Sequence, residues 1–471
     1  MMVACLTMQR TMLAAFAVLA AGCSDEPAGP ASPPVPTIQS AVVTANPRNV
    51  LSAVVSARLR DADSAAARFR LAGAGSADSV TPAVRAVADV TEIPVLGLLP
   101  GSRYSLRVIA FGPGGETEGD ALELTTPDLP SDVPRYTASG SDPSPGYVVF
   151  AAGSYGLVID NTGRVVWYHH FANGLGLNFA AQPAGRYVAR LVTPDPADIE
   201  PWLELDPLGN TTRTLGCARG LQPRFHDLLL EPDGAYWIMC DETRTMDLSA
   251  QGGVVGAQVT GTAVQHIAAS GALLFHWSAF DHFAITDVGP AERATAAVNW
   301  THGNALDIDS DGNLLVSFRN LNEITKIDVG TGGVIWRLGG LRNRFTFLDT
   351  PAPAFSHQHS VRRDAAGSLL LLDNIGDPNE SRAERYVLDE RAMTARLDRS
   401  YASLPRVVTQ VGGSAQVLPG GRTLVSFGTT GRVEEYDATG RVVWRIEGHA
   451  GYVFRAQRIR SLYAPGVGAA R

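Results

Sequence analysis

The segment SHQHSVRR, Ser356–Arg363, holds two histidines two residues apart in a chain that has only ten histidines. In an extended strand, residues i and i+2 point to the same side, so we expect His357 and His359 to share one face. A neutral imidazole in such a place can act as a nucleophile, as a general acid or base, or as a metal ligand. These uses define the chemistry that the segment could support.

Two other segments place histidine beside groups that suit this chemistry. FHD contains His226 next to Asp227. In HGN, His302 lies two residues before Asn304, and we expect the two to share one face of an extended strand. Arg319, in SFRN, stands at the end of the strand expected after HGN. A guanidinium is permanently charged and can donate two parallel hydrogen bonds to an oxyanion. The set predicts a nucleophilic histidine surrounded by donors for a developing negative charge.

A metal site is the alternative use of the same residues. Neutral imidazole binds Zn²⁺, and Asp227 adjoins His226. However, the sequence has no HxxxH or HExxH spacing, and strands on opposite sides of a channel need not bring their ligands within the roughly 2 Å that zinc requires. We therefore predict a site without metal or cofactor. Its catalytic residues are His359, His226, His302, Arg319 and Asn304.

The elements that must position these residues are short strands in an irregular repeat. A turn glycine followed by an apolar strand recurs in PAGRYVARLV, PDGAYWIMC, SDGNLLVSF, AAGSLLLLD and PGGRTLVSF. A second signature ends near tryptophan, in GRVVWYHH, GALLFHW, GGVIWRL and GRVVWRI. A period of roughly 40 to 60 residues is typical of four-stranded propeller blades with insertions. Together with a blade around GYVVFAAGSYGLVIDNTGRVVWYHH, the repeats predict an all-β, six-bladed β-propeller over residues 136–465, with seven blades as the alternative count. The segment YVFRAQRIRSLY is expected to help close the ring.

The repeat also provides a register for the polar residues. Eight residues before the turn glycine, three of five blades carry an imidazole or an amide. Counting back eight residues from each turn glycine (Gly185, Gly234, Gly312, Gly367 and Gly421) leads, in the same order, to Leu177, His226, Asn304, His359 and Gly413. The strand before this turn is expected to be the innermost and to line the central channel. The register therefore favours His359 over His357 as the reactive residue. We interpret the remaining histidines, His169, His170, His266, His276, His282 and His449, as structural.

The start of the chain predicts export and a lipid anchor. Arg10 is followed by an apolar run, residues 12–21, which is too short to span a membrane in the mature protein. The residues LAAGCS resemble a bacterial lipobox, which predicts a lipoprotein signal peptide over 1–22 and lipidation of Cys23 in the bacterial cell envelope. An ordinary signal peptide is the alternative. Residues 23–36 are then a flexible tether. In such an oxidising compartment, we hypothesise a disulfide between Cys217 and Cys240.

Residues 37–127 predict a separate module. The spacing Leu98-x-Pro100-Gly101-x-x-Tyr104 resembles the tyrosine corner of a fibronectin type III β-sandwich, and the strand that follows alternates apolar and polar residues. We see no chemical constellation in this part of the sequence. Thr125–Arg135 is interpreted as a proline-broken linker.

Composition narrows the class of partner. The formal net charge is −8, and the sequence contains no run of basic residues. Both features argue against a nucleic-acid partner and favour a small-molecule substrate. Hydrophobic residues at 45% and charged residues at 18% describe a globular protein. The oligomeric state stays open, a homodimer being one alternative.

Two long segments carry a resemblance to a known family. THGNALDIDSDGNLLVSFRNLNEITKIDVGTGGVIWRLGG, followed by FSHQHSVRRDAAGSLLLLDN, resembles the bacterial arylsulfate sulfotransferases, which need no nucleotide sulfate donor. FHDLLLEPDGAYWI and GGSAQVLPGGRTLVSFG match neighbouring blades. The likeness covers roughly residues 140 to 465, and the ordered set FHD, HGN, SFRN and HQHS is more specific than any single motif.

The resemblance implies transfer of a sulfuryl group from a phenolic sulfate ester to an acceptor phenol by a ping-pong mechanism. His359 matches the transiently sulfated nucleophile, and the surrounding groups of the family match His226, His302, Asn304 and Arg319. His357 has no clear counterpart, and the disulfide expected from the family lies elsewhere than Cys217 and Cys240. Two other classes stay open: a non-catalytic surface propeller lipoprotein that binds a partner, and a quinoprotein-like dehydrogenase, since GxVVW strands also occur in those propellers.

Overall fold

The computed structural model describes residues 32–73, 75–172, 174–182, 185–192, 200–349, 354–376, 379–447 and 451–464. Its regular structure is almost entirely β-strand, with two four-residue helices, α1 (Ala279–His282) and α2 (Pro290–Arg293), and five 3₁₀ turns in the described segments. The predicted all-β class is confirmed. No helix in these segments is long and apolar enough to cross a membrane. Cys23, the signal peptide and most of the predicted tether lie outside the described residues.

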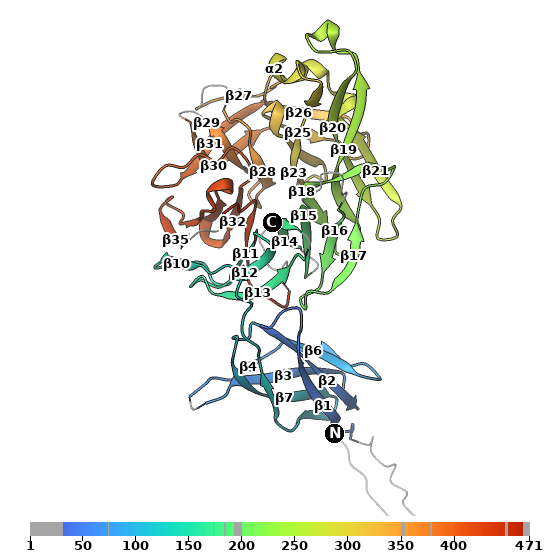
Figure 1. The fold of residues 1–471 in the computed structure, drawn as a ribbon, viewed down its shortest axis with the longest axis vertical. Coiled ribbons are helices and arrows are strands. Elements are labelled where there is room, and N and C mark those ends of the chain that lie inside the picture. Colours follow the sequence, from blue (N-terminus) through green and yellow to red (C-terminus); the bar gives the residue numbers. More distant parts are fainter. Residues whose placement is uncertain are drawn as a thin grey trace, which may run out of the picture.

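The N-terminal part is a sandwich of two sheets (Figure 1, blue). One sheet contains β1 (Thr37–Ala45), β2 (Ser52–Arg60) and β6 (Thr91–Leu96). The other is built on β3 (Ser64–Leu71) and β7 (Arg103–Gly112), with β4 (Ser79–Val80), β5 (Val84–Arg85), β8 (Gly115–Glu118) and β9 (Leu122–Thr125) beside them. Alternating apolar residues of both sheets form one core. At its edge, the backbone N–H of Leu99 donates to the Tyr104 hydroxyl over 2.8 Å, which is the kind of contact a tyrosine corner makes.

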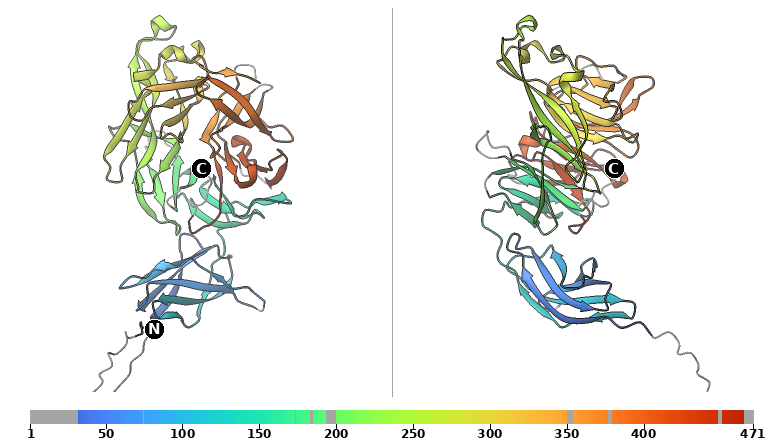
Figure 2. Two further views of the ribbon diagram at one scale, coloured as in Figure 1. Left: turned by 180° about the vertical axis from the view of Figure 1, so that it is seen from behind. Right: turned by 90° about the vertical axis from the view of Figure 1, so that its right-hand side faces the viewer.

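The described strands after residue 136 form six sheets arranged around a common centre, a propeller-like fold (Figures 1 and 2). In chain order the innermost strands are β14 (Leu175–Gln182), β18 (Gln222–Leu230), β23 (Gly303–Ile308), β28 (His359–Arg363), β32 (Ser414–Leu418) and β36 (Ala456–Ile459). The second strands are β15 (Arg186–Val192), β19 (Tyr236–Met246), β24 (Leu314–Phe318), β29 (Leu369–Gly376), β33 (Arg422–Ser426) and β11 (Tyr147–Ala152). The third strands are β16 (Trp202–Leu205), β20 (Ala257–Ile267), β25 (Glu323–Ile327), β30 (Glu380–Asp389), β34 (Val433–Tyr436) and β12 (Tyr155–Ile159).

Four of the six outer strands contain the tryptophan signature. The outer strands are β17 (Thr211–Leu215), β21 (Leu273–Ser278), β26 (Val334–Gly339), β31 (Thr394–Ala402), β35 (Val442–Glu447) and β13 (Val165–His170), with β10 (Thr137–Gly140), β22 (Ala297–Asn299) and β27 (Thr346–Phe347) added at edges. The signature lies in β13, β21, β26 and β35. Its tryptophans, Trp167, Trp277, Trp336 and Trp444, are at most 1% exposed. Each packs in a core with strands of the adjacent sheet, as Trp167 does with Phe179 and Tyr187. The recurring tryptophan therefore joins sheet to sheet.

The turn glycines of the repeat occupy a conformation that favours glycine. Gly234, Gly312 and Gly367 have φ of 90°, 82° and 81°, in the left-handed region where a Cβ atom is disfavoured. Each lies in the turn between the innermost and the second strand of its sheet. The first signature therefore marks these turns, and the prediction that the strand before them is innermost is confirmed.

Both ends of the chain close the ring. β36 pairs with β11, Tyr147 lying opposite Ile459, and β10 pairs with β35, Thr137 lying opposite Glu447. The prediction that YVFRAQRIRSLY helps to close the ring is confirmed. The sandwich contacts the ring on this side, where the N–H of Leu96 donates to the Tyr463 hydroxyl over 3.0 Å.

Polar side chains connect each innermost strand to the next. Asn178 Nδ2 donates to His226 O over 2.8 Å, and Asn304 Nδ2 donates to Gln358 O over 2.7 Å. Lower in the channel, the N–H of Leu230 donates to Gln182 Oε1 over 2.8 Å. Because these bonds tie neighbouring sheets through their backbones, they fix the depth at which each channel side chain projects.

Candidate functional site

The structure brings the three predicted histidines together at one end of the channel. His226 lies in β18, His359 is the first residue of β28, and His302 immediately precedes β23. His226 Nε2 lies 3.2 Å from His302 Nε2, and the ring centroids of His226 and His359 are 6.5 Å apart. The three rings come from three different sheets, so the register read from the repeat located one common site.

The expectation that His302 and His357 lie in extended strands is wrong. Both have left-handed backbones, with φ of 48° and 55°. Such a conformation costs a non-glycine residue roughly 1–3 kcal/mol and persists only where the surroundings enforce it. The N–H of Arg319 donates to His302 O over 3.0 Å and the N–H of His357 donates to Asn322 Oδ1 over 2.8 Å, which helps to hold the two turns. His357 therefore does not share a strand face with His359, and its Nδ1 lies 2.8 Å from Ser356 Oγ.

Hydrogen bonds define the proton positions of His226 and His302. Arg224 Nε donates to His226 Nδ1 over 3.3 Å, so the neutral His226 ring carries its proton on Nε2 and donates it to His302 Nε2. His302 must then carry its own proton on Nδ1, where the structure places Asn299 Nδ2 at 2.7 Å. This proton position therefore requires the Asn299 amide to be turned, so that its oxygen faces the ring in place of the nitrogen. Asp241 forms an ion pair with Arg224.

Sequence reasoning missed Arg224, Asp241 and Asn299. The only signal in the sequence was the position of Arg224, two residues before His226 in the same strand. Asp241 and Asn299 come from other parts of the sheet, and no local pattern connects them with the histidines.

His359 is held by contacts from β29, from the residues before β28 and from the loop that follows β31. Its Nδ1 lies 2.7 Å from Asn374 Oδ1 and 3.0 Å from His357 O. The N–H of Gly412 points at the other ring nitrogen, Nε2, over 3.2 Å. Asn374 and Gly412 were not expected from the sequence.

All three imidazoles are uncharged at neutral pH. Burial lowers the pKa of His359 to about 4. Burial also lowers the pKa of His226 and of His302 well below the usual value, and the charge of Arg224 adds to this effect in both cases. The site therefore presents ring lone pairs and N–H groups in place of imidazolium charge.

Arg319 and Asn304 differ in how free their donors are. Arg319 Nη1 donates to Asn320 Oδ1 over 2.9 Å and Nη2 to Gln410 O over 3.2 Å, but its buried Nε has no hydrogen-bond partner. Asn304 is fully buried, and its Nδ2 already donates to Gln358 O. Arg319 thus retains a donor for an anion, whereas Asn304 also ties β23 to the segment before β28.

Aromatic side chains stand beside the histidines. The Phe225 ring stacks on His226 with centroids 4.0 Å apart, and the Phe454 ring is 5.7 Å from His226 and 6.3 Å from His359. Tyr452 lies 6.2 Å from Phe454. An aryl ring can pack against this aromatic wall, defined as Phe225, Tyr452 and Phe454.

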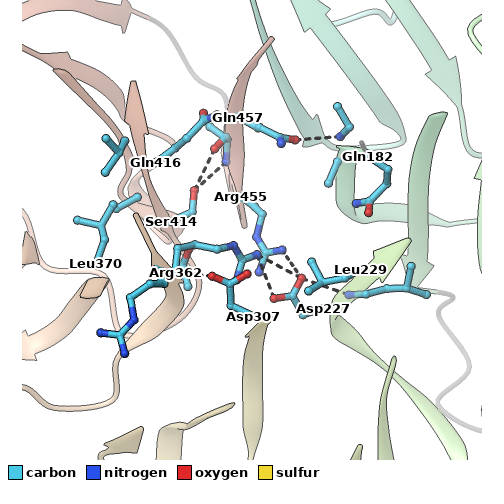
Figure 3. A pocket seen from close by; sticks show the side chains of 18 of the residues that line it. Gln182, Asp227, Leu229, Asp307, Arg362, Leu370, Ser414, Gln416, Arg455 and Gln457 are labelled. Carbon is cyan, nitrogen blue, oxygen red and sulfur yellow. Dashed lines mark hydrogen bonds and ion pairs between the residues drawn. The ribbon is translucent and has the colours of Figure 1, made fainter. Parts of the chain in front are cut away.

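A buried ion cluster lies between the innermost strands (Figure 3). Asp227 lies 3.1 Å from Arg362 Nη2 and 2.5 Å from Arg455 Nη1. The cluster lines a cavity of about 340 Å³ together with residues such as Gln182 and Gln457, and none of the described lining residues is a histidine. Arg362 belongs to this cluster and also lines the cavity.

Two cysteines and two further histidines make structural contacts in the described residues. Cys217 and Cys240 form a disulfide, with Cα atoms 6.2 Å apart, as hypothesised. His266 and His282 stack on Trp237 and Trp277, as expected for structural residues, whereas His449 lies outside the described segments. No group of three His, Cys, Asp or Glu side chains in those segments has the arrangement of a metal site.

Comparisons with known proteins give one family. Residues 223–449 match the family model described as "Arylsulfotransferase (ASST)", which confirms the resemblance read from the motifs. No curated protein matches the chain. Solved structures similar to it include a protein of unknown function from Bacteroides caccae (TM-score 0.44, 14% identity, covering 68% of this chain and 100% of that one). They also include a streptogramin B lyase (TM-score 0.38, 12% identity, covering 66% of this chain and 84% of that one). A third is a calcium-binding protein, regucalcin, from Agrobacterium tumefaciens str. C58 (TM-score 0.31, 14% identity, covering 68% of this chain and 95% of that one).

Proposed function

Since this chain matches the arylsulfotransferase family over residues 223–449, we propose that it is an aryl-sulfate sulfotransferase acting through a sulfohistidine. It moves a sulfuryl group from a phenolic sulfate ester to an acceptor phenol. The observation that carries the proposal is the convergence of His226, His302 and His359 beside the aromatic wall. A ring nucleophile and an aryl surface in one place are what the two half-reactions need.

In the first half-reaction, the Nε2 lone pair of His359 attacks the sulfur of the donor. An N–S bond forms as the S–O bond to the aryl group breaks, and the electron pair leaves with the phenoxide. As in phosphoryl transfer, catalysis of such a step depends on positioning and on stabilising charge on the equatorial oxygens. Arg319 supplies a permanent charge and an unused N–H for these oxygens.

The His226–His302 pair handles the proton. The anionic donor raises the pKa of this pair when it binds, so that the pair takes up a proton with the substrate. This proton passes to the departing phenoxide, and the neutral pair then deprotonates the acceptor phenol. The acceptor oxygen attacks the sulfur, the N–S bond breaks, and the pair releases the proton as the product leaves.

Intact-mass analysis after exposure to p-nitrophenyl sulfate tests the proposal. We expect one added sulfuryl group, mapping to the peptide that contains His359, and its disappearance when phenol is added. His359→Asn should show neither the adduct nor the release of p-nitrophenol. An adduct on another residue would contradict the nucleophile assignment, and a wild-type protein inert with a panel of aryl sulfates would contradict the function.

The same proposal includes the finer features of the chain. We take the six sheets as six propeller blades and the N-terminal part as a fibronectin type III-like sandwich, with boundaries at residues 37–127 and 136–465. Export and lipidation at Cys23 would place the site in an oxidising compartment, and the Cys217–Cys240 disulfide supports this. Labelling of the wild type with radioactive palmitate, and its loss in Cys23→Ser, tests the anchor.

A further inference from the structure

His359 is in contact with one side chain that no motif singled out. Asn374 lies in β29, the strand next to β28, and is fully buried. Its Nδ2 donates to two backbone carbonyls of the loop after β31, Thr409 O over 2.9 Å and Gly412 O over 2.8 Å. Because both hydrogens of the amide nitrogen face acceptors, the orientation of the amide is fixed, and its Oδ1 faces His359 Nδ1 at 2.7 Å.

The contacts of the His359 ring assign its proton. Nδ1 faces two acceptors, Asn374 Oδ1 and His357 O, and therefore carries the hydrogen. Nε2 receives the N–H of Gly412 over 3.2 Å, and only a lone pair can accept it. Two independent observations thus agree on the tautomer protonated at Nδ1.

We propose that Asn374 is a positioning residue that holds His359 in the Nδ1–H tautomer, so that Nε2 keeps the lone pair with which it attacks the sulfur once the N–H of Gly412 is displaced from it. The inference rests on the proposed function for its catalytic meaning, but the tautomer itself is a property of the resting protein. In the sulfuryl-enzyme, Nε2 no longer has a lone pair for Gly412, and this N–H becomes available to a sulfuryl oxygen.

The same contacts connect the nucleophile to the loop. Asn374 joins Thr409 and Gly412, and Arg319 Nη2 donates to Gln410 O in the same loop over 3.2 Å. A carbon atom added to Gly412 would lie 2.5 Å from the Tyr452 hydroxyl, so the loop passes too close to this ring for a side chain. Asn374 therefore sets both the ring proton and the position of the loop donor.

The test is ¹⁵N NMR of histidine-labelled full-length protein, with His359→Asn used to assign the His359 signals. In the wild type we expect the proton on Nδ1. In Asn374→Ala, we expect a mixture with the Nε2–H tautomer and a rate of sulfuryl-enzyme formation lower by on the order of 10²-fold, since a ring held in the wrong tautomer cannot attack. Asn374→Asp should keep Nδ1–H and shift the acid limb of the pH–rate profile to higher pH, because a carboxylate stabilises the imidazolium.

Gln182→Ala is the matched control, since Gln182 is a buried amide that joins two innermost strands without touching a histidine. It should keep both the tautomer and the rate. A wild-type ring protonated at Nε2 overturns the proposal, as does an Asn374→Ala protein with unchanged tautomer and rate. If Asn374→Ala fails to fold, the proposal is tested by the tautomer in the wild-type spectrum and by the pH–rate profile of Asn374→Asp. If no aryl sulfate reacts, the spectrum still shows which nitrogen of His359 carries the proton. Failure of the proposed function can therefore be distinguished from failure of the proposed role of Asn374.

Discussion

At the scale of single residues, the site depends on imidazoles that stay neutral although arginines surround them. Burial is the main cause of the low pKa of His359, His226 and His302, and nearby guanidinium charge acts in the same direction. A neutral ring can serve as a nucleophile, whereas an imidazolium cannot. In the proposed reaction, the arginines would thus keep the rings nucleophilic and also attract the anionic donor.

This arrangement predicts the pH dependence of the first half-reaction. Because the pKa of His359 is lowered to about 4, its neutral form persists well below pH 6.5, and activity is lost only as the pH falls through the lowered pKa. With p-nitrophenyl sulfate, whose leaving group needs no proton, kcat/KM should stay constant down to about pH 5 and fall with a midpoint near 4. Stopped-flow measurement of kcat/KM, which reports the free enzyme, checks this. A midpoint near 6.5 would contradict a buried nucleophile.

The His226–His302 pair predicts a dependence on the leaving group. Phenoxide is more basic than p-nitrophenoxide and needs a proton as it departs. In His302→Gln, turnover of phenyl sulfate should therefore fall by roughly 10²–10⁴-fold, and that of p-nitrophenyl sulfate much less. Paired kinetics with both donors measure the difference. Equal losses with both donors would remove this pair from the proton-transfer role, and His359→Asn should lose both activities alike.

At the scale of elements, the innermost strands are joined through the channel by buried charge. Asp227 on β18 meets Arg362 on β28, and Arg455, immediately before β36, completes the cluster. In addition, the N–H of Leu306 on β23 donates to Asp227 over 3.0 Å. One carboxylate therefore contacts three other sheets at their innermost edge.

Removing that carboxylate should destabilise the ring strongly. Asp227→Ala leaves Arg455, 9% exposed, without its ionic partner, and a broken buried pair costs about 3–5 kcal/mol. Denaturant unfolding followed by tryptophan fluorescence measures the loss. Asp89→Ala removes an exposed pair with Arg58 and should cost less than about 1 kcal/mol. Comparable losses for the two variants would show that the cluster contributes little.

The sequence predicted the strands well and the turns around them less well. Turn glycines and buried tryptophans repeat, so the innermost strands and the residues His226 and His359 could be located from spacing alone. His302 and His357 could not be placed, because a left-handed backbone in a non-glycine residue leaves no periodic signal. Leu177 was assigned to the channel register, but an irregularity in pairing between Gly176 and Asn178 shifts the strand, and Asn178 makes the inter-strand bond instead.

At the scale of the whole molecule, the site is assembled from contacts between distant parts of the chain. Asn374 contacts His359 from the neighbouring strand β29, Gly412 contacts it from the loop between β31 and β32, and Phe454 contacts it from the segment before β36. The contact with Phe454 depends on closure of the ring, and the sequence repeat does not show which side chains meet the histidines when the ring closes. The type of residue in the site was therefore predictable, and the partners that orient each ring were not.

Ring closure also sets an order of events. A chain synthesised from its N-terminus contains His226, His302 and His359 well before Phe454 and Arg455, which come later in the sequence. The last innermost strand, β36, can pair with β11 only after these residues have been made. Until that pairing forms, one side of the site lacks its aromatic wall, and Asp227 lacks one of its two arginines. During synthesis, the three histidines would thus be present before the site is complete, and reactivity would begin only when the last strand has paired.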